Sequence, residues 1–292
     1  MTLILNGTAT AARIQSKLQE RIKKIKGRKP GLAVILVGAD PASVTYVKAK
    51  RKACESVGIF SPETLFPATI TENELLQEIV KFNEDPMIDG ILIQLPLPTH
   101  IQTLRIMEAI NPSKDIDGFH PLNVGKLLVG DESGLLPCTP QGICALLHDY
   151  QISLEGKHVV IVGRSNIVGK PLAAMLLQKK KGYNATVTVA NSKTQNLQEL
   201  CLSADILIAA AGNVHLIKAN MIKKGAVVVD VGIHRIEDSS APRGYHLTGD
   251  VAYEEASLKC AAITPAPGGV GPMTIVMGLS NTLLSYERRQ KA

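Results

Sequence analysis

The sequence predicts an α/β protein of two domains, because strand-like and helix-like segments alternate in two separate series. The first series occupies residues 9–110, where short apolar runs alternate with segments of helical spacing. A second series starts near residue 158, and a polar stretch with two prolines, residues 111–124, separates the two as a loop without clear periodicity. Such alternation is typical of a mostly parallel sheet covered by helices. The length of 292 residues agrees with two domains.

The elements of the first series carry their own end signals. Residues 31–38 form a continuous apolar run between two glycines, the pattern of a buried parallel strand. Asp40 followed by Pro41 predicts a helix start, and Thr71 with Glu74 predicts a capping box. We therefore expect strands at residues 31–38, 59–66 and 88–95, and helices at residues 9–26, 41–57, 71–83 and, from Thr99, 99–110.

The second series has the layout of a Rossmann-like half. Thr139 and Pro140 predict the start of a helix that ends near Tyr150, and helices are expected between the first four strands. Residues 232–250 are expected to be irregular, and a helix at about residues 274–289 follows the glycine- and proline-rich stretch PAPGGVGPM. The strands are expected at residues 158–162, 185–190, 205–210, 226–231 and 260–264.

Composition favours an ordinary globular protein. Hydrophobic residues make up 45% of the chain and charged residues 20%, and no uncharged apolar run reaches the roughly 18 residues of a membrane span. Most of the net charge of +6 is expected to lie on solvated surface, and the remainder suits polyanionic small molecules. An aromatic content of 3% and the lack of an arginine-rich block argue against nucleic acid. The five cysteines include no C-x-x-C pair, no cluster has metal-ligand spacing, and the chain start lacks the basic region of a signal peptide. We expect a reduced, metal-free, cytoplasmic protein without a membrane partner.

The stretch VIVGRSNIVGKP, residues 160–171, combines a strand, a glycine turn and a helix start. This layout directs backbone N–H groups and a helix N-terminus toward a phosphate. Only the first and last glycines of the dinucleotide fingerprint are present, Gly163 and Gly169, with Arg164 and Ser165 after the first. A tight strand-to-helix turn of any α/β protein would look similar, so the motif alone indicates nucleotide binding only weakly.

The end of the next predicted strand indicates which nucleotide is bound. It runs into Asn191, Ser192, Lys193 and Thr194, where an NAD site usually places a carboxylate for the ribose hydroxyls. Here hydroxyls, an amide and a lysine stand instead, with Arg164 in the preceding turn. A 2′-phosphate would be accepted at such a site, so the sequence favours NADP.

A second group of polar residues is a candidate for acid–base chemistry. Tyr46 and Lys50 are four residues apart on one helix face, Gln94 follows a predicted strand, and Asp117 lies in the polar loop. A lysine that acts as a general base needs a lowered pKa, which burial and cationic neighbours favour. The plain alternatives are a solvated lysine and, for Asp115 and Asp117, turn residues that hydrogen-bond their own backbone.

Seven motifs together resemble the bifunctional methylenetetrahydrofolate dehydrogenase/methenyltetrahydrofolate cyclohydrolase family, the FolD family. They run in order over nearly the whole chain: YVKAK, ILIQLPLP, KDIDGFHPLNVG, PCTPQG, VIVGRSNIVGKP, VVDVGI and TPAPGGVGPMT. The resemblance implies oxidation of 5,10-methylenetetrahydrofolate with NADP, followed by hydrolysis of the methenyl product to 10-formyltetrahydrofolate. It also implies a homodimer, a folate-binding catalytic domain at residues 1–118 joined by a C-terminal helix at 272–290, and an NADP-binding domain at 119–271, with a cleft between them.

The resemblance also implies the roles of individual residues. Lys50 is then the cyclohydrolase lysine, Gln94 pairs with it, Tyr46 stacks on the folate, and Asp117 holds the pterin end. The implied substrate-binding set further contains Ile93, Leu95, Pro267, Gly268, Gly269, Val270 and Gly271. The implied cofactor-binding set contains Gly163, Arg164, Ser165, Ser192 and Ile233.

Two departures from the family pattern concern the adenosine end of the cofactor site. Ala190-Asn191 stands where the family usually has Cys-His, and a few extra residues lie around 179–184.

Two other interpretations also remain: a dehydrogenase without the cyclohydrolase, and a nucleotide-sensing module without turnover. The joint presence of Lys50, Gln94 and Asp117 argues against both.

Overall fold

A computed structural model describes residues 2–241 and 244–291 as two compact units. Ala12–Cys138 and Ile275–Ala292 form one, here called the three-stranded unit; Met1–Ala11 and Thr139–Thr274 form the other, the six-stranded unit. Within the described ranges, none of the helices has the length and apolar character needed to cross a membrane.

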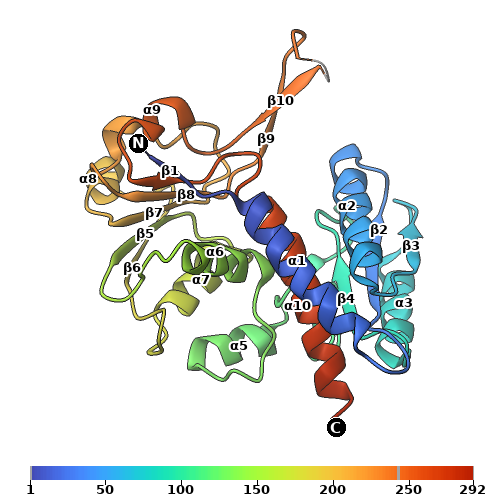
Figure 1. Cartoon of the computed structure of the whole chain (residues 1–292). Helices are drawn as coiled ribbons and strands as arrows, with labels where there is room; N and C mark the ends of the chain where they lie inside the picture. Colours follow the sequence, from blue (N-terminus) through green and yellow to red (C-terminus); the bar gives the residue numbers. More distant parts are fainter. Residues whose placement is uncertain (1, 242–243, 292) are drawn as a thin grey trace. The chain divides into compact units, whose positions relative to one another are not determined.

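The three-stranded unit is built on a parallel sheet of order β3-β2-β4, and all six residues of β2 are buried (Figure 1). Its apolar core includes Ile35, Leu75 and Ile91, which are fully or almost fully buried. The elements lying wholly in this unit are β2 (Leu32–Val37), α2 (Pro41–Val57), β3 (Glu63–Phe66), α3 (Glu72–Glu84), β4 (Gly90–Ile93), α4 (Thr103–Ala109) and α5 (Pro121–Val129). The unit also holds most of α1 (Gly7–Lys23) and of α10 (Val270–Arg289).

Two of the predicted helix starts are confirmed in atomic detail. The carboxylate of Asp40 accepts a hydrogen bond from the Ser43 N–H at 2.8 Å, and Pro41 occupies the first turn of α2. Thr71 and Glu74 form the expected reciprocal capping box of α3. The Asp40 cap sets where α2 begins, and Tyr46 and Lys50 follow on that helix.

The six-stranded unit contains a parallel sheet of order β1-β11-β8-β7-β5-β6. Strand β5 lies between β6 and β7, so the chain reverses its direction of winding at the β5–β7 boundary. In open α/β sheets, ligands bind at the carboxyl ends of strands beside such a switch point. The remaining elements are β1 (Leu3–Ile4), α6 (Cys138–Asp149), β5 (His158–Val162), α7 (Gly169–Leu176), β6 (Thr186–Ala190), α8 (Leu197–Leu202), β7 (Ile206–Ala209), η1 (Ala219–Met221), β8 (Val227–Asp230), β9 (His234–Glu237), β10 (Tyr245–Thr248), α9 (Tyr253–Ser257) and β11 (Ala262–Ile263).

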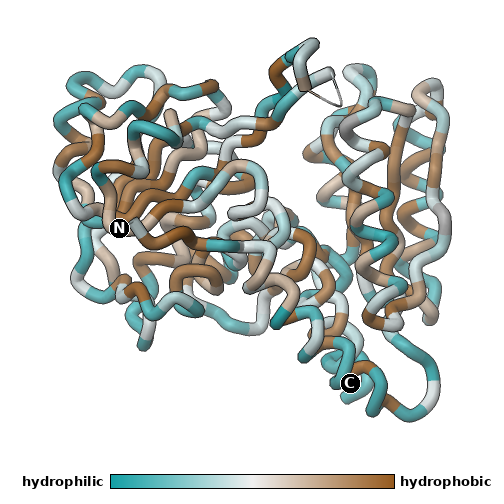
Figure 2. The backbone as a smooth tube through the Cα atoms, turned by 45° about the horizontal axis from the view of Figure 1, so that its top comes forward, coloured by the Kyte–Doolittle hydropathy of each residue, from teal (hydrophilic) through white to brown (hydrophobic). Residues whose placement is uncertain are grey.

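Both sheets contain buried apolar strands, which appear as brown segments in the interior of each unit in Figure 2. In the six-stranded unit, Val160, Leu207, Val228 and Ile263 from four neighbouring strands are fully buried in one core cluster. Continuous apolar runs of this kind are expected where helices cover both faces of a parallel sheet. The predicted α/β class is confirmed.

The prediction that residues 232–250 are irregular is wrong. Strands β9 and β10 pair in antiparallel register, from Tyr245 with Glu237 to Thr248 with His234, and the hairpin projects from its unit (Figure 1). Both strands are polar and partly exposed, so no apolar run marked them. The Arg235 guanidinium lies 4.2 Å from the centre of the Tyr245 ring and links the two strands.

Smaller corrections concern helix boundaries. Thr99 does not begin a helix: a turn closed by the Ile101 N–H to Pro98 carbonyl hydrogen bond precedes α4 and buries Ile101. The expected loop 111–124 ends early, because α5 begins at Pro121, with His120 Nδ1 accepting from the Leu122 N–H at 3.0 Å. Between β7 and β8 only the three-residue helix η1 forms, and the short strand β1, paired with β11, was not expected.

Candidate active site

The candidate catalytic residues of the three-stranded unit converge at the end of β4. Tyr46 and Lys50 lie one helical turn apart on α2, and the Lys50 Nζ donates a hydrogen bond to Gln94 Oε1 at 3.1 Å. Gln94 directly follows β4; its backbone N–H donates to the Ile35 carbonyl, and its Nε2 donates to the Leu95 carbonyl at 2.8 Å. The Gln94 oxygen is thus held toward the lysine. We call Lys50, Gln94 and Asp117 the lysine cluster.

Asp117 belongs electrostatically to the same cluster. Desolvation by the surrounding protein raises the pKa of its carboxyl to about 6, while the nearby charge of Lys50 opposes this shift. Burial also raises the pKa of the Tyr46 phenol, whose residue remains 38% exposed. The structure therefore brings Lys50, Gln94 and Asp117 together. A solvated lysine and an isolated turn aspartate would not need to lie near each other.

The turn role in the motif KDIDG belongs to the other aspartate. The Asp115 carboxylate accepts hydrogen bonds from the N–H groups of Phe119 and His120 and from Asn123 Nδ2. Burial raises its pKa, and these donors oppose the shift. Asp115 thus organises the loop, and this leaves the Asp117 carboxyl for the lysine cluster.

Two residues that the sequence did not single out support Asp117. Burial raises the pKa of the Cys138 thiol well above its usual value, so it remains a donor, to the Ile116 carbonyl at 3.2 Å. The buried Asn281 on α10 donates from Nδ2 to the carbonyls of Ile116, at 2.8 Å, and Leu136, at 2.9 Å. The only sequence signal for Asn281 is a polar amide in the predicted C-terminal helix.

A pocket of about 510 Å³ lies at the switch point of the six-stranded sheet. It is lined by residues 163–165 after β5, by 191, 192 and 194 after β6, and by 210, 211 and 213 around the end of β7. Its volume falls within the range of about 300–1,000 Å³ that is usual for small-molecule sites. We call it the nucleotide pocket.

The two glycines of the turn are required by close backbone contacts. A Cβ on Gly163, whose φ is +131°, would lie 2.0 Å from the Ala210 carbonyl oxygen, and one on Gly169 would lie 2.1 Å from the Gly163 oxygen. The Ser165 hydroxyl accepts from the Val168 N–H at 3.1 Å and closes the turn before α7. This tight strand–turn–helix geometry fits a dinucleotide phosphate approaching the backbone.

The pocket is lined by several of the polar residues that the sequence analysis named. Arg164 and Ser192 are exposed and line it, and none of the lining residues is acidic. Asn191 forms a local turn instead: its N–H donates to Thr194 Oγ1 at 2.8 Å, and its Oδ1 accepts from the Lys193 N–H. The residues present therefore fit an anionic nucleotide.

Ile233 and the loop 265–271 form a separate small hollow of the same unit. A Cβ on Gly271 would lie 3.3 Å from Ile233 Cδ1, and one on Gly269 would lie 2.5 Å from the Pro265 oxygen. The Thr8 N–H donates to the Gly268 carbonyl at 3.0 Å and fixes the loop from α1. The expected folate loop and the expected nicotinamide contact are thus neighbours, although Val270 and Gly271 already belong to α10.

Both parts of the chain match models of one protein family. Residues 5–117 match the catalytic domain of tetrahydrofolate dehydrogenase/cyclohydrolase, and residues 137–290 match the NAD(P)-binding domain of the same enzyme. The chain belongs to the tetrahydrofolate dehydrogenase/cyclohydrolase family. Membership confirms the enzyme class predicted from the motifs, a bifunctional FolD dehydrogenase and cyclohydrolase of one-carbon folate metabolism with an NAD(P)-binding domain.

FolD relatives resemble the chain over its whole length. The bifunctional FolD protein of Protochlamydia amoebophila is 55% identical over 288 residues, which cover 99% of each chain. The crystal structure of FolD from Campylobacter jejuni has 51% identity and a TM-score of 0.93, covering 99% of this chain and all of that one. FolD from Trypanosoma brucei, solved with NADP cofactor and an inhibitor, has 38% identity and a TM-score of 0.94, covering 100% and 99%.

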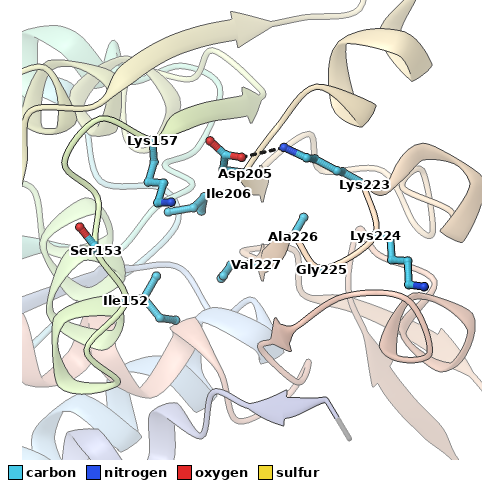
Figure 3. A pocket seen from close by; sticks show the side chains of 10 residues that line it. All are labelled: Ile152, Ser153, Lys157, Asp205, Ile206, Lys223, Lys224, Gly225, Ala226 and Val227. Carbon is cyan, nitrogen blue, oxygen red and sulfur yellow. Dashed lines mark hydrogen bonds and ion pairs between the residues drawn. The ribbon is translucent and has the colours of Figure 1, made fainter.

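A second pocket of this FolD-family chain, about 350 Å³, lies at the amino ends of β7 and β8 (Figure 3). Three lysines line it, but Lys223 pairs with Asp205 at 2.8 Å, and Lys224 points away from Lys157 (Figure 3). The cationic groups do not converge, so the pocket has none of the organisation of the nucleotide pocket. Within residues 2–241 and 244–291, no group of three or more His, Cys, Asp or Glu side chains could hold a metal ion.

Proposed function

We propose that the chain oxidises 5,10-methylenetetrahydrofolate to 5,10-methenyltetrahydrofolate with NADP+ and then hydrolyses the product to 10-formyltetrahydrofolate. The observation that carries this proposal is the Lys50–Gln94 hydrogen bond beside Asp117, in a chain that belongs to the family. Both reactions use Asp117 to hold the folate, but only the hydrolysis uses Lys50 as a base, and a nucleotide-sensing module uses neither residue.

In the proposed hydrolysis, Lys50 handles the proton. Addition of water to the methenyl cation forms a C–O bond and releases a proton before the ring opens to the formyl product. In its uncharged form, Lys50 is the nitrogen base that accepts this proton, and Gln94 Oε1 orients it through the hydrogen bond at 3.1 Å. General acid–base assistance of this kind typically contributes about a hundred- to ten-thousand-fold in rate.

In the proposed oxidation, alignment matters more than acid–base chemistry. NADP+, when bound, accepts a hydride from the methylene carbon, and the lone pair of a folate nitrogen stabilises the cation that forms. The residues of the chain therefore bind and orient. We assign cofactor binding to Gly163, Arg164, Ser165, Ser192 and Ile233, of which all but Ile233 line the nucleotide pocket.

We assign folate binding to two sets of residues. In the three-stranded unit, Asp117 accepts hydrogen bonds from the pterin, Tyr46 stacks on the folate, and Ile93 and Leu95 flank Gln94. In the six-stranded unit, Pro267, Gly268, Gly269, Val270 and Gly271 line the folate pocket, supported by the close backbone contacts of this loop.

We propose NADP as the preferred cofactor because Arg164 and Ser192 line the pocket and no carboxylate does. The ratio of kcat/KM for NADP+ and NAD+ should be at least about 10-fold, which equals about 1.4 kcal/mol of differential binding. Steady-state kinetics with both cofactors measure it. Comparable values would mean that Asn191 and its turn provide no phosphate selectivity.

Three further expectations of the family resemblance stay proposals. The first is a division into functional domains at residues 1–118, with 272–290, and at 119–271. We also propose a homodimer paired through the cofactor domain and a cytoplasmic location. Sedimentation equilibrium of the purified chain tests the dimer, and a monomer at micromolar concentration would contradict it.

The two activities are tested together by absorbance. Purified protein is mixed with NADP+ and 5,10-methylenetetrahydrofolate, and NADPH and methenyltetrahydrofolate are followed over time. The proposal expects NADPH to form while the methenyl intermediate stays low. If methenyltetrahydrofolate accumulates and then disappears no faster than it does in buffer, the chain is a dehydrogenase alone. Binding of NADP+ without turnover would indicate a sensing module.

A further inference from the structure

Asp250 is a fully buried carboxylate whose four acceptor positions are all occupied. Its Oδ2 accepts from the N–H groups of Ala211, at 2.6 Å, and Gly212, at 2.9 Å. Its Oδ1 accepts from the Asn213 N–H at 3.0 Å and contacts His234 Nε2 at 2.7 Å. Because an ionised carboxylate only accepts hydrogen bonds, His234 Nε2 carries a proton.

The four donors belong to two segments that border the candidate cofactor site. Ala211 and Asn213 line the nucleotide pocket just after β7. His234 begins β9 directly after Ile233, the expected nicotinamide contact. One carboxylate thus joins the loop 211–213 to the segment that carries Ile233.

Asp250 is itself held in place by a second buried carboxylate. Asp230, at the end of β8, accepts from the backbone N–H groups of Asp250, at 2.9 Å, Val251, at 3.0 Å, and Gly232, at 2.9 Å. A Cβ on Gly232 would lie 2.4 Å from Asp250 Oδ1, and one on Gly249 would lie 1.9 Å from Asp230 Oδ2. The backbone is therefore shaped around the two carboxylates.

We propose that Asp250 is a positioning residue for dinucleotide binding: it fixes the loop 211–213 and His234, so the wall of the nucleotide pocket is formed before the cofactor arrives. Preorganisation of this kind raises affinity because the bound loop has little conformational freedom left to lose. The inference rests on the proposed NADP-dependent function, since it concerns the binding step of that reaction. Asp250 therefore affects the cofactor indirectly, through the position of the loop 211–213.

The test is the variant Asp250→Asn, which keeps the shape of the side chain. An amide replaces one acceptor oxygen with an NH2 group, so at least one N–H of the loop 211–213 faces another donor. We expect the Kd and KM for NADP+ to rise about 10-fold or more. Hydrolysis of methenyltetrahydrofolate, measured without nucleotide, should stay within about twofold of the wild type, because the lysine cluster is unchanged.

The matched control is Asp205→Asn. Asp205 also accepts a backbone N–H, from His158 at 3.0 Å, and pairs with Lys223, but it lies at the opposite, amino-terminal end of the strands (Figure 3). This control should leave the Kd for NADP+ unchanged. If Asp250→Asn folds poorly, His234→Phe removes a single donor and should still weaken NADP+ binding by a measurable factor.

Calorimetric titration with NADP+ separates this inference from the proposed function. Wild-type protein that binds NADP+ without oxidising the folate would refute the function, yet the Kd of Asp250→Asn would still decide the inference. The inference is overturned if Asp250→Asn binds NADP+ with the wild-type Kd. It is also overturned if both activities and the melting temperature fall together while the Kd in His234→Phe is unchanged, since Asp250 would then be structural only.

Discussion

At the scale of single residues, the lysine cluster depends on one hydrogen bond between distant parts of the chain. Lys50 lies on α2 and Gln94 follows β4, and the chain positions are 44 apart. The amide oxygen of Gln94 is oriented because its Nε2 donates to the Leu95 carbonyl. Because Gln94 has this second contact, replacement of Lys50 should leave Gln94 in place and test the chemistry of the lysine.

The substitution Lys50→Met should separate the two activities. Methionine keeps an unbranched chain on the helix, so α2 and Tyr46 should stay in place. Hydride transfer needs no proton from the protein, so NADPH formation should persist, while hydrolysis should fall by about a hundred- to ten-thousand-fold. Methenyltetrahydrofolate supplied directly, with its loss compared with the rate in buffer, measures this.

The control for this substitution is Lys48→Met. Lys48 is exposed on the same helix, and its replacement should leave both activities at wild-type levels. Hydrolysis at the wild-type rate by folded Lys50→Met would show that the proton acceptor is another group.

The raised pKa of Asp117 predicts a pH dependence of folate binding. With a pKa of about 6, the carboxyl is ionised at neutral pH and protonated below. The protonated form loses an acceptor for the pterin, so the KM for folate should rise about tenfold at one pH unit below that pKa. Asp117→Asn should bind folate weakly at all pH values and abolish this dependence.

The stability of the fold responds to the same pKa in the opposite direction. Because the folded-state pKa of Asp117 is raised, the native state binds the proton more tightly than the unfolded state. This group therefore contributes stability as pH falls from 6 toward its ordinary 3.8. Weaker folate binding at low pH that coincided with unfolding would contradict the assignment, and circular dichroism at each pH checks it.

At the scale of elements, the turn from β5 to α7 is set by contacts between backbones. Gly163 approaches the Ala210 carbonyl after β7, and Gly169 approaches Gly163. These contacts bring the ends of β5 and β7 together at the switch point. Only glycine leaves room for them, which is a stronger reason for these residues than a phosphate motif alone.

The substitution Gly163→Ala should therefore damage both the fold and the nucleotide pocket. Its Cβ would lie 2.0 Å from the Ala210 oxygen at a φ of +131°, so we expect a loss of about 2 kcal/mol or more in unfolding free energy. Urea unfolding measures the loss, and the KM for NADP+ should rise as well.

The control for Gly163→Ala is a substitution at a helical glycine, Gly125. Gly125 on α5 has open space where a Cβ would lie, with no neighbouring group of the described residues within 4 Å. Gly125→Ala should therefore stabilise the protein by about 0.5–1 kcal/mol. Equal effects of the two substitutions would show that the contact at Gly163 relaxes easily.

At the scale of the whole molecule, contacts between residues near the start of the chain and the final helix hold the three-stranded unit together. The fully buried Asp89 carboxylate accepts two hydrogen bonds from Arg28, at 2.6 and 2.8 Å, and one from Arg289, at 2.8 Å. Ser285 on α10 donates to the Asp89 carbonyl at 2.6 Å. The final helix is thus a structural part of the unit that carries the lysine cluster.

The substitution Asp89→Ala should destabilise the protein by about 3 kcal/mol, because two arginines and the Gly31 N–H lose a buried acceptor. Thermal or urea unfolding measures the change. The exposed pair Lys81–Glu78 provides the control, since Lys81→Ala should change stability by less than about 0.5 kcal/mol. A cost below about 1 kcal/mol for Asp89→Ala would show that water replaces the lost acceptor.

By itself, the sequence determined the α/β class, the family, the capped starts of α2 and α3 and the residues of the lysine cluster. These features depend on local periodicity, on capping signals within a few residues and on motifs of consecutive residues. Tertiary structure alone decided the pairing of β1 with β11, the hairpin β9–β10 and the roles of Asn281 and Asp250. Asn281 contacts a carbonyl 165 positions away and Asp250 contacts N–H groups 37 to 39 positions away. No local pattern encodes such contacts, because their hydrogen bonds form only after the strands are assembled.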